Sequence, residues 1–168
     1  MADEDVQSSE VRRAWRAVAS VNDPEIPPLS VVDLGMIVDV EVAEDRVTVR
    51  MTPTFAACPA LDVIRKDIAE AVGAAGFAEV QVVTVYDPPW TTDRITAEGR
   101  KKLKEFGLAP PSGNVDRNLV QISLENVPCP HCNSTNTALE SAFGPTLCRS
   151  IHYCNACLQS FEHMKPLP

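Results

Sequence analysis

Two pairs of cysteines in the C-terminal third constrain the fold of this chain more than any other feature of its sequence. Cys129 pairs with Cys132 and Cys154 with Cys157, each with the spacing C-x2-C, and 21 residues separate the two pairs. A C-x2-C segment forms a tight turn that directs two thiolates at one point, and two such turns complete a tetrahedral shell of four sulfurs. The spacing therefore predicts a zinc ribbon with one structural zinc ion per chain.

Other chemistry fits the same four ligands. An iron–sulfur cluster accepts thiolates equally well, and paired cysteines also form disulfides or redox centres. We favour zinc because residues 119–168 contain few large apolar side chains, so they need another source of folding free energy. Zinc binding by such a segment contributes on the order of 10 kcal/mol. Short strands are expected around the site at these positions: about 119–124, 137–142, 147–153 and 160–164.

Four further residues near the ribbon could bind metal, but we expect none of them to be a ligand. His131 lies inside the first C-x2-C turn and is expected on the surface. His152 and His163 are expected to be strand residues. Cys148 is interpreted as a structural residue of the ribbon, with ligand substitution or redox chemistry as alternatives.

The N-terminal part of the chain alternates helical and strand periodicity. A helical stripe ends before Asn22, two period-2 runs at 34–42 and 46–52 predict a hairpin, and a second apolar stripe ends at Gly76. A valine-rich strand at 79–85 and a basic helix at 97–106, with Thr96 as its N-cap, follow. This order predicts an α/β (α+β) fold, a small two-layer α-β-β-α-β domain in which two helices cover one face of a three-stranded sheet.

The domain organisation follows from composition. The α/β domain is expected over 8–107, a linker rich in Pro, Gly and Ser over 108–118, and the four-cysteine ribbon over 119–168. Because fewer than 110 residues make a modest core, the sequence is compatible with a homodimer.

Charge and hydropathy exclude several classes of function. The chain carries 15 basic and 23 acidic side chains, a net charge of −8, so it lacks the basic surface that binds a nucleic-acid backbone. The short basic run at 100–104 is interpreted as a solvated helix face. No apolar run approaches the length that spans a membrane, and the acidic N-terminus does not resemble a secretory signal. We expect a cytoplasmic protein with reduced thiols.

Cys58 is the sixth cysteine and lies apart from the others, between the second strand and the second predicted helix. Because Pro59 suits a first helical turn, Cys58 is expected near the N-cap, where the helix dipole lowers the pKa of a thiol. Such a thiolate can bind a soft metal or transfer sulfur. The alternative is a buried cysteine that serves only in packing. No general base lies nearby in the sequence, so thiol catalysis is not supported.

Three other candidates have ordinary structural alternatives. Asp23 and Asp33 could face a metal ion, but each also suits a turn. Trp90 could be an exposed binding residue or could close the core. No phosphate-binding loop, dinucleotide-binding or hydrolase motif is present.

Four motifs occur in the order found in a known domain. They are the segments Asp23-Pro-Glu-Ile-Pro27, Asp33-Leu-Gly35, Thr52-Pro-Thr-Phe-Ala-Ala-Cys58-Pro59 and Asp87-Pro-Pro-Trp90-Thr-Thr-Asp-Arg-Ile-Thr96. Together they resemble the metal–sulfur cluster assembly domain of SufT-like proteins, over about 10–107. The added ribbon makes the chain similar to PaaD-type (also called PaaJ) accessory proteins of the bacterial phenylacetyl-CoA epoxidase system, which acts in aerobic phenylacetate degradation.

This resemblance implies a function. The chain would be a non-catalytic accessory factor, often dimeric, for maturation of the iron–sulfur or di-iron centre of the epoxidase, with the oxygenase or reductase subunits as partners. Cys58 matches the reactive cysteine of the family, and Asp33, Thr54 and Trp90 match positions near it. Iron or an iron–sulfur cluster would be held transiently. The sequence departs from SufT-like members after the cysteine, where Pro59-Ala60 replaces a glycine-containing segment. The alternative function is an electron-transfer or scaffolding subunit of the oxygenase complex.

Overall fold

The structure is a computed structural model that describes residues 2–55, 58–111 and 126–166, with the backbone alone for 2–8. The chain divides into two compact units, 1–90 and 91–168, each described here by itself. The division falls between Trp90 and Thr91, whereas the sequence led us to expect it after 107. In the described part of the chain, no helix is long and apolar enough to cross a membrane.

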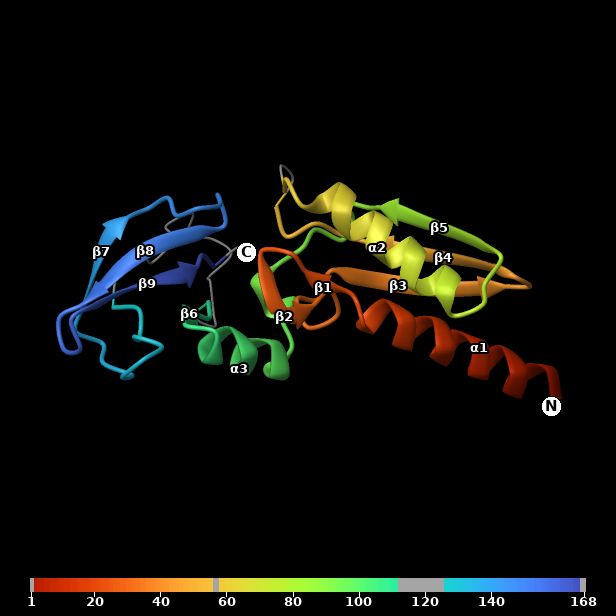
Figure 1. The fold of residues 1–168 in the computed structure, drawn as a ribbon, viewed down its shortest axis with the longest axis horizontal. Helices are drawn as coiled ribbons and strands as arrows, with labels where there is room; N and C mark the ends of the chain where they lie inside the picture. Colours follow the sequence, from red (N-terminus) through yellow and green to blue (C-terminus); the bar gives the residue numbers. More distant parts are fainter. Residues whose placement is uncertain (1, 56–57, 112–125, 167–168) are drawn as a thin grey trace. The chain divides into compact units, whose positions relative to one another are not determined.

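Among its described residues, the first unit contains two α-helices and two small sheets, which can be followed in Figure 1. Its elements, in chain order, are α1 (Ala2–Ala19), β1 (Asn22–Asp23), β2 (Ile26–Ser30), β3 (Ile37–Ala43), β4 (Arg46–Met51), α2 (Leu61–Ala74) and β5 (Glu79–Thr84). The predicted α-β-β-α-β order is confirmed, and β1–β2 is a further antiparallel pair that the sequence did not indicate.

The main sheet has the strand order β3-β4-β5. β3 and β4 are antiparallel, whereas β4 and β5 are parallel because α2 carries the chain across the sheet between them. α1 packs against β3 and α2, and α2 packs against β5, so both helices cover the same face. Val47, Val49 and Met51 of the central strand are fully buried on that face. The predicted two-layer arrangement is confirmed.

Two element boundaries differ from the sequence-based expectation. The strand expected from residue 34 begins at Ile37, because Gly35 adopts a positive φ of 66° and closes a turn in which its N–H donates to Val32 O. The first helix begins at Ala2, before residue 8, where the α/β domain is expected to start.

In the part that the structure describes, the second unit contains one α-helix, one short 3-10 helix and a four-stranded sheet. Its elements are the 3-10 helix η1 (Thr92–Arg94), α3 (Ala97–Glu105), β6 (Leu108–Ala109), β7 (Thr137–Ser141), β8 (Arg149–Cys154) and β9 (Gln159–Met164). The sheet order is β6-β9-β8-β7. Thr96 Oγ1 accepts a hydrogen bond from Gly99 N at 2.9 Å, which confirms the predicted N-cap of α3. The three ribbon strands expected within the described residues are present.

The expected linker is wrong at its first two residues. Leu108 and Ala109 form β6 and pair in parallel with Glu162 and His163 of β9. Both residues are almost fully buried, because they cover one edge of the ribbon sheet. The rest of the expected linker from 112 onward, and the strand expected at 119–124, lie outside the described residues.

Candidate functional site

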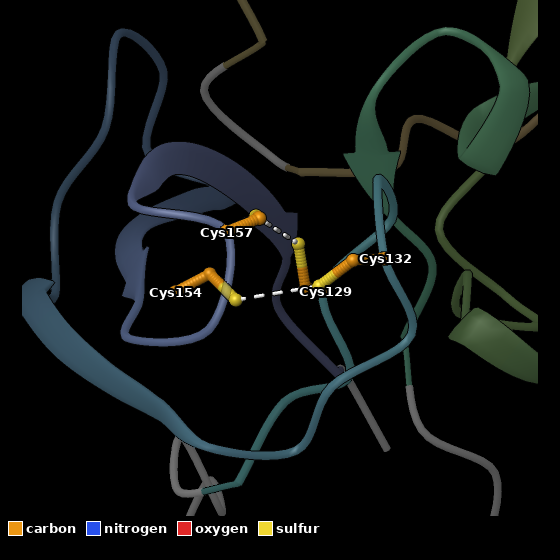
Figure 2. Close-up of side chains that lie close together, drawn as sticks. All are labelled: Cys129, Cys132, Cys154 and Cys157. Carbon is orange, nitrogen blue, oxygen red and sulfur yellow. Dashed lines mark hydrogen bonds between the residues drawn. The ribbon is translucent and has the colours of Figure 1, made fainter.

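Four cysteine side chains of the second unit converge on one point. Figure 2 shows Cys129 and Cys132 on one loop and Cys154 and Cys157 on another, with their sulfurs facing one another. All four sulfurs lie within 4.8 Å of each other. The Cys129–Cys157 and Cys132–Cys154 sulfur pairs are 3.7 Å and 3.6 Å apart. All four thiols are free.

These distances test whether zinc fits. Four sulfurs at about 2.3 Å from a central zinc ion form a tetrahedron with edges of about 3.8 Å. The observed separations of 3.6 and 3.7 Å match that edge and far exceed the length of a disulfide bond, about 2.05 Å. The set of four thiolates suits zinc as a closed structural site. The four cysteines thus would hold the ion, which would supply folding free energy to the ribbon and no reaction chemistry.

The two cysteine loops have the same backbone design. Asn133 N donates to Cys129 O and Leu158 N donates to Cys154 O, each at 2.9 Å. Asn133 and Leu158 also share a positive φ, 62° and 61°, at the position after the second cysteine of each pair. The turn that the C-x2-C spacing predicts is therefore formed twice, and the left-handed residue closes each copy.

Contacts between the loops fix their relative position. Asn155 N donates to Asn136 O at 2.9 Å, and the side-chain amide of Asn155 donates to Asn136 Oδ1 at 3.1 Å. These residues lie beside the two cysteine pairs. The scaffold therefore holds the four sulfurs at tetrahedral separations through its own hydrogen bonds.

Local hydrogen bonds make the four thiols unequal. The backbone N–H of Cys157, and to a smaller extent that of Ala156, points at the Cys154 sulfur and lowers the pKa of that thiol to about 6. Burial raises the pKa of the Cys157 thiol to about 12, and the neighbouring sulfurs add to this effect. Four crowded thiols resist simultaneous ionisation, and a divalent cation between them removes that penalty.

The four other candidates of the ribbon lie outside this cluster, as expected. His131 is exposed. Cys148 is half-buried, and its sulfur lies 3.1 Å from Thr146 Oγ1. His152 lies in β8 and His163 in β9, and both are completely buried.

The sequence did not reveal how the two buried histidines are used. Ser150 Oγ lies 3.0 Å from His152 Nε2 and 3.4 Å from His163 Nδ1, so one hydroxyl bridges both rings. His152 also stacks on Phe161, with ring centroids 5.5 Å apart. Within the described residues, His152 Nδ1 and His163 Nε2 are buried without a hydrogen-bond partner. Burial, and secondarily the charge of His152, lowers the pKa of His163 to about 4, so this ring is neutral near pH 7. The sequence signal for this arrangement is that Ser150 and His152 lie two positions apart in one strand, so their side chains share one face of the sheet.

The second candidate site surrounds Cys58 in the first unit. α2 begins at Leu61 with Ala60 as its N-cap, so Cys58 precedes the cap by two residues instead of occupying it. Cys58 O accepts from Leu61 N at 3.3 Å and Cys58 N donates to Phe55 O at 3.0 Å. The side chain is half-buried and forms no disulfide. Cys58 is thus held in a tight turn that leaves part of its side chain open to solvent.

Asp33 and Trp90 stabilise a neighbouring turn. Asp33 Oδ2 accepts from Ser30 N, and Ser30 Oγ accepts from Asp33 N, both at 3.0 Å. Trp90 is almost fully buried, and its indole Nε1 donates to Leu34 O at 2.8 Å. Trp90 therefore closes the core, and the carboxylate of Asp33 serves the turn. Asp23 is likewise a turn residue, since its Oδ1 accepts from the N–H groups of Glu25 and Ile26.

The Cys58 segment starts beside this turn. Thr52 N donates to Met36 O at 2.7 Å, so the chain that leaves β4 is anchored next to the residues that follow Leu34. Thr54 is half-buried in the same segment as Cys58. The segment that carries Thr54 and Cys58 thus starts next to the turn that Asp33 and Trp90 stabilise.

Comparison with known proteins matches the two parts of the chain to two domain families. Residues 12–85 match the sequence model described as "Iron-sulfur cluster assembly protein", and residues 118–165 match "PaaD zinc beta ribbon domain". A solved structure from Bacillus anthracis, a domain of unknown function of the DUF59 family, superposes with a TM-score of 0.56 at 25% identity. It covers 60% of this chain and 96% of that chain. An iron–sulfur assembly domain is therefore joined to a zinc ribbon.

A relative that spans almost the whole chain identifies the family. An Escherichia coli (strain K12) protein, named as a component of 1,2-phenylacetyl-CoA epoxidase, is 38% identical over 156 residues, which cover 93% of both chains. The chain belongs to this PaaD family. A Porphyromonas gingivalis protein named "Fe-S protein maturation auxiliary factor" is 39% identical over 90 residues, 52% of this chain and 85% of its own length.

Proposed function

We propose that this chain is a non-catalytic accessory factor for maturation of the iron–sulfur or di-iron centre of a phenylacetyl-CoA 1,2-epoxidase system. Its family membership and the iron–sulfur assembly domain support this role. The structural observation that carries the proposal is Cys58, a partly accessible cysteine outside any disulfide, held in a turn of that domain and separate from the four-cysteine cluster. A thiol in this position can take up a soft metal without disturbing the ribbon.

The proposed chemistry at Cys58 is ligand exchange. The thiol loses its proton and its sulfur coordinates iron, either as an ion or as part of an iron–sulfur cluster, which is cargo and not a resident group. A cysteine or carboxylate of the client then replaces the Cys58 sulfur, which regains a proton from solvent. No electron is transferred in this exchange. Serine cannot substitute, because soft thiolates are the ligands that hold iron–sulfur units.

Asp33, Thr54 and Trp90 are proposed to shape this relay site. Trp90 and Asp33 stabilise the turn through the Leu34 carbonyl and Ser30. Thr54 belongs to the segment that presents Cys58. We assign these three residues to positioning of the segment and give Cys58 alone the bond to cargo.

The ribbon is proposed to bind one structural zinc and to dock the client, either the oxygenase or the reductase of the epoxidase system. Tetrahedral sulfur separations support the zinc assignment. The six cysteines, all within the described residues, form no disulfide, which supports a reducing, cytoplasmic setting. We further propose that the protein works as a homodimer and that the isolated chain has no epoxidase activity.

The proposal is tested by co-expressing the full chain with the epoxidase subunits. Cys58→Ser is expected to lower the iron content and the activity of the epoxidase at least about tenfold, since a ligand to the cargo is lost. Cys148→Ser is the matched control, because Cys148, like Cys58, is half-buried, in no disulfide and outside the metal cluster, and it should leave both values unchanged. If Cys58→Ser supports full iron loading, the relay role is wrong.

A second function is favoured by one specific property of the ribbon. Its four thiolates also suit iron, and such a centre would make the chain an electron-transfer subunit. Purified protein with visible absorption and acid-labile sulfide would support that function, whereas colourless protein with one zinc would exclude it. A scaffolding role remains if Cys58→Ser has no effect while the chain still binds the complex.

A further inference from the structure

The two edges of the sheet in the first unit differ in how well they are protected. β3 forms one edge, and its pairing with β4 is interrupted by a bulge between Ile37 and Asp39. β3 also carries two carboxylates, Asp39 and Glu41. Bulges and charges are the devices that keep an edge strand from pairing with another chain. β5 forms the other edge, pairs with β4 without interruption and contains neither lysine nor proline.

The backbone of β5 directs half of its polar groups away from the sheet. Glu79 N donates to Asp45 O at 3.2 Å and Val85 N donates to Met51 O at 2.8 Å, so the odd-numbered residues face β4. Along a strand the direction alternates, so Val80, Val82 and Thr84 present their N–H and C=O groups outward. Within the described residues, one side chain bonds to these outward groups. The guanidinium of Arg65 donates to Val82 O at 3.5 Å, at the protein surface.

The side chains of this edge are only partly covered. Val80 and Val82 lie on the same face of the sheet as Val47 and Val49, their register partners in β4. The β4 valines are fully buried, whereas Val80 and Val82 remain half-buried. A groove of about 300 Å³ runs beside Val82, and α2 lines its other side with Asp62, Arg65, Lys66 and Ala69. The outer side of β5 therefore offers half-buried valines together with outward backbone groups, of which Val82 O accepts from Arg65 at the surface.

We propose that β5 pairs with β5 of a second copy of this chain, antiparallel about a twofold axis at Val82. The outward residues then meet each other: Val82 faces Val82 of the second copy, and Val80 faces Thr84 of the second copy. Three such pairs form about six hydrogen bonds. The two three-stranded sheets become one continuous sheet, in which the half-buried valines gain cover.

The composition of the edge favours a second copy as its occupant. Glu79 is the one charged residue of β5, and in this register it faces Val85 of the second copy, so like charges do not oppose each other. The remaining pairs join valine to valine, threonine or glutamine, which suit cross-strand contact. This inference rests on the homodimer proposed above and names its interface. It is independent of the relay role of Cys58, so failure of one leaves the other intact.

The oligomeric state of the full chain provides the first test. Light scattering during gel filtration is expected to give twice the chain mass of 18.3 kDa. Val82→Pro is expected to weaken the dimer at least about tenfold, because proline removes the central outward N–H while the bonds from β5 to β4 persist. A monomer at the concentrations used for crystallography would overturn the proposal, as would a dimer that Val82→Pro does not weaken although the variant is folded.

A cross-linking experiment tests the register even if Val82→Pro fails to fold. Val82→Cys places the new sulfur opposite its copy, with Cα atoms about 5.5 Å apart, within the range of a disulfide. Val80→Cys is the matched control, because the two substituted residues would be about 13 Å apart along the strand. Both variants carry Cys58→Ser and Cys148→Ser, which remove the two native cysteines outside the four-cysteine cluster. Mild oxidation should give a covalent dimer with Val82→Cys only; equal cross-linking of both variants, or of neither, would overturn the proposal.

Discussion

The sulfur atoms of Cys132 and Cys154 lie 3.6 Å apart, although 21 residues separate them in the sequence. Between them the chain forms β7 and most of β8 and returns to the starting point. The strand pairing therefore positions two ligands from distant segments at the edge length of a sulfur tetrahedron around zinc. Metal binding and formation of the β7–β8 pair are coupled, because each brings the same two segments together.

Replacing one ligand should consequently unfold the ribbon without unfolding the first unit. We expect Cys154→Ser to reduce the zinc content from about one equivalent to near zero, since a closed site requires all four ligands. Elemental analysis measures the loss. Hydrogen exchange should show that the amides of β8 and β9 lose protection, while those of β4 do not. Cys148→Ser is the control and should keep its zinc. A Cys154→Ser protein with full zinc content would contradict the site.

The hydrogen bond from Trp90 to Leu34 O predicts a cost in stability of the first unit. Trp90→Phe keeps a large aromatic ring but leaves the buried carbonyl of Leu34 without this donor, which costs about 1–3 kcal/mol. Urea denaturation followed by circular dichroism measures the change. Trp15→Phe, at a half-buried tryptophan of α1, is the control and should cost less than half as much. Equal effects of the two substitutions would show that the hydrogen bond contributes little.

Asp33 allows structural and functional roles to be separated. Asp33→Asn retains an oxygen that can accept from Ser30 N, so we expect stability to change by less than about 0.5 kcal/mol. Asp33→Ala removes the acceptor and should destabilise the first unit by about 1 kcal/mol. If Asp33 only positions the Cys58 segment, Asp33→Asn will load iron into the client as well as the wild type does. A loading defect in a stable Asp33→Asn protein would instead show that the charge itself is required.

Much of this structure could be predicted from local sequence patterns. The four zinc ligands, the N-cap at Thr96 and the hairpin of β3 and β4 all follow from spacing or periodicity within short segments. β6 could not be predicted, because two residues carry no periodicity and their pairing depends on β9, more than fifty positions away. The start of β3 was predicted too early, at residue 34. Gly35 fits the period-2 pattern between Leu34 and Met36, although its backbone has a positive φ and forms a turn. Pairing of the two buried histidines through Ser150 depends on strand register, which spacing does not determine.

The buried His163 predicts a specific loss of stability in acid. Its pKa in the folded chain is about 4, whereas an unfolded histidine has a pKa of about 6.5. Above pH 6.5 the ring is neutral in both states and has no effect. As the pH falls from 6.5 to 4, the unfolded state binds a proton that the folded state excludes, and the free energy of unfolding decreases by up to about 1.4 kcal/mol per pH unit.

His163→Leu removes this titration while keeping an apolar side chain in the buried position. Cysteine protonation and zinc release also destabilise the ribbon in acid, but they act equally in the wild type and in the variant. We therefore expect the wild type to lose stability more steeply between pH 6.5 and pH 4.5, with the two curves parallel between pH 7 and pH 8. Both tryptophans lie in the first unit, so exchange of the β8 and β9 amides at fixed zinc concentration is the suitable measurement. Parallel curves across the whole range would mean that His163 accepts a proton in the folded ribbon.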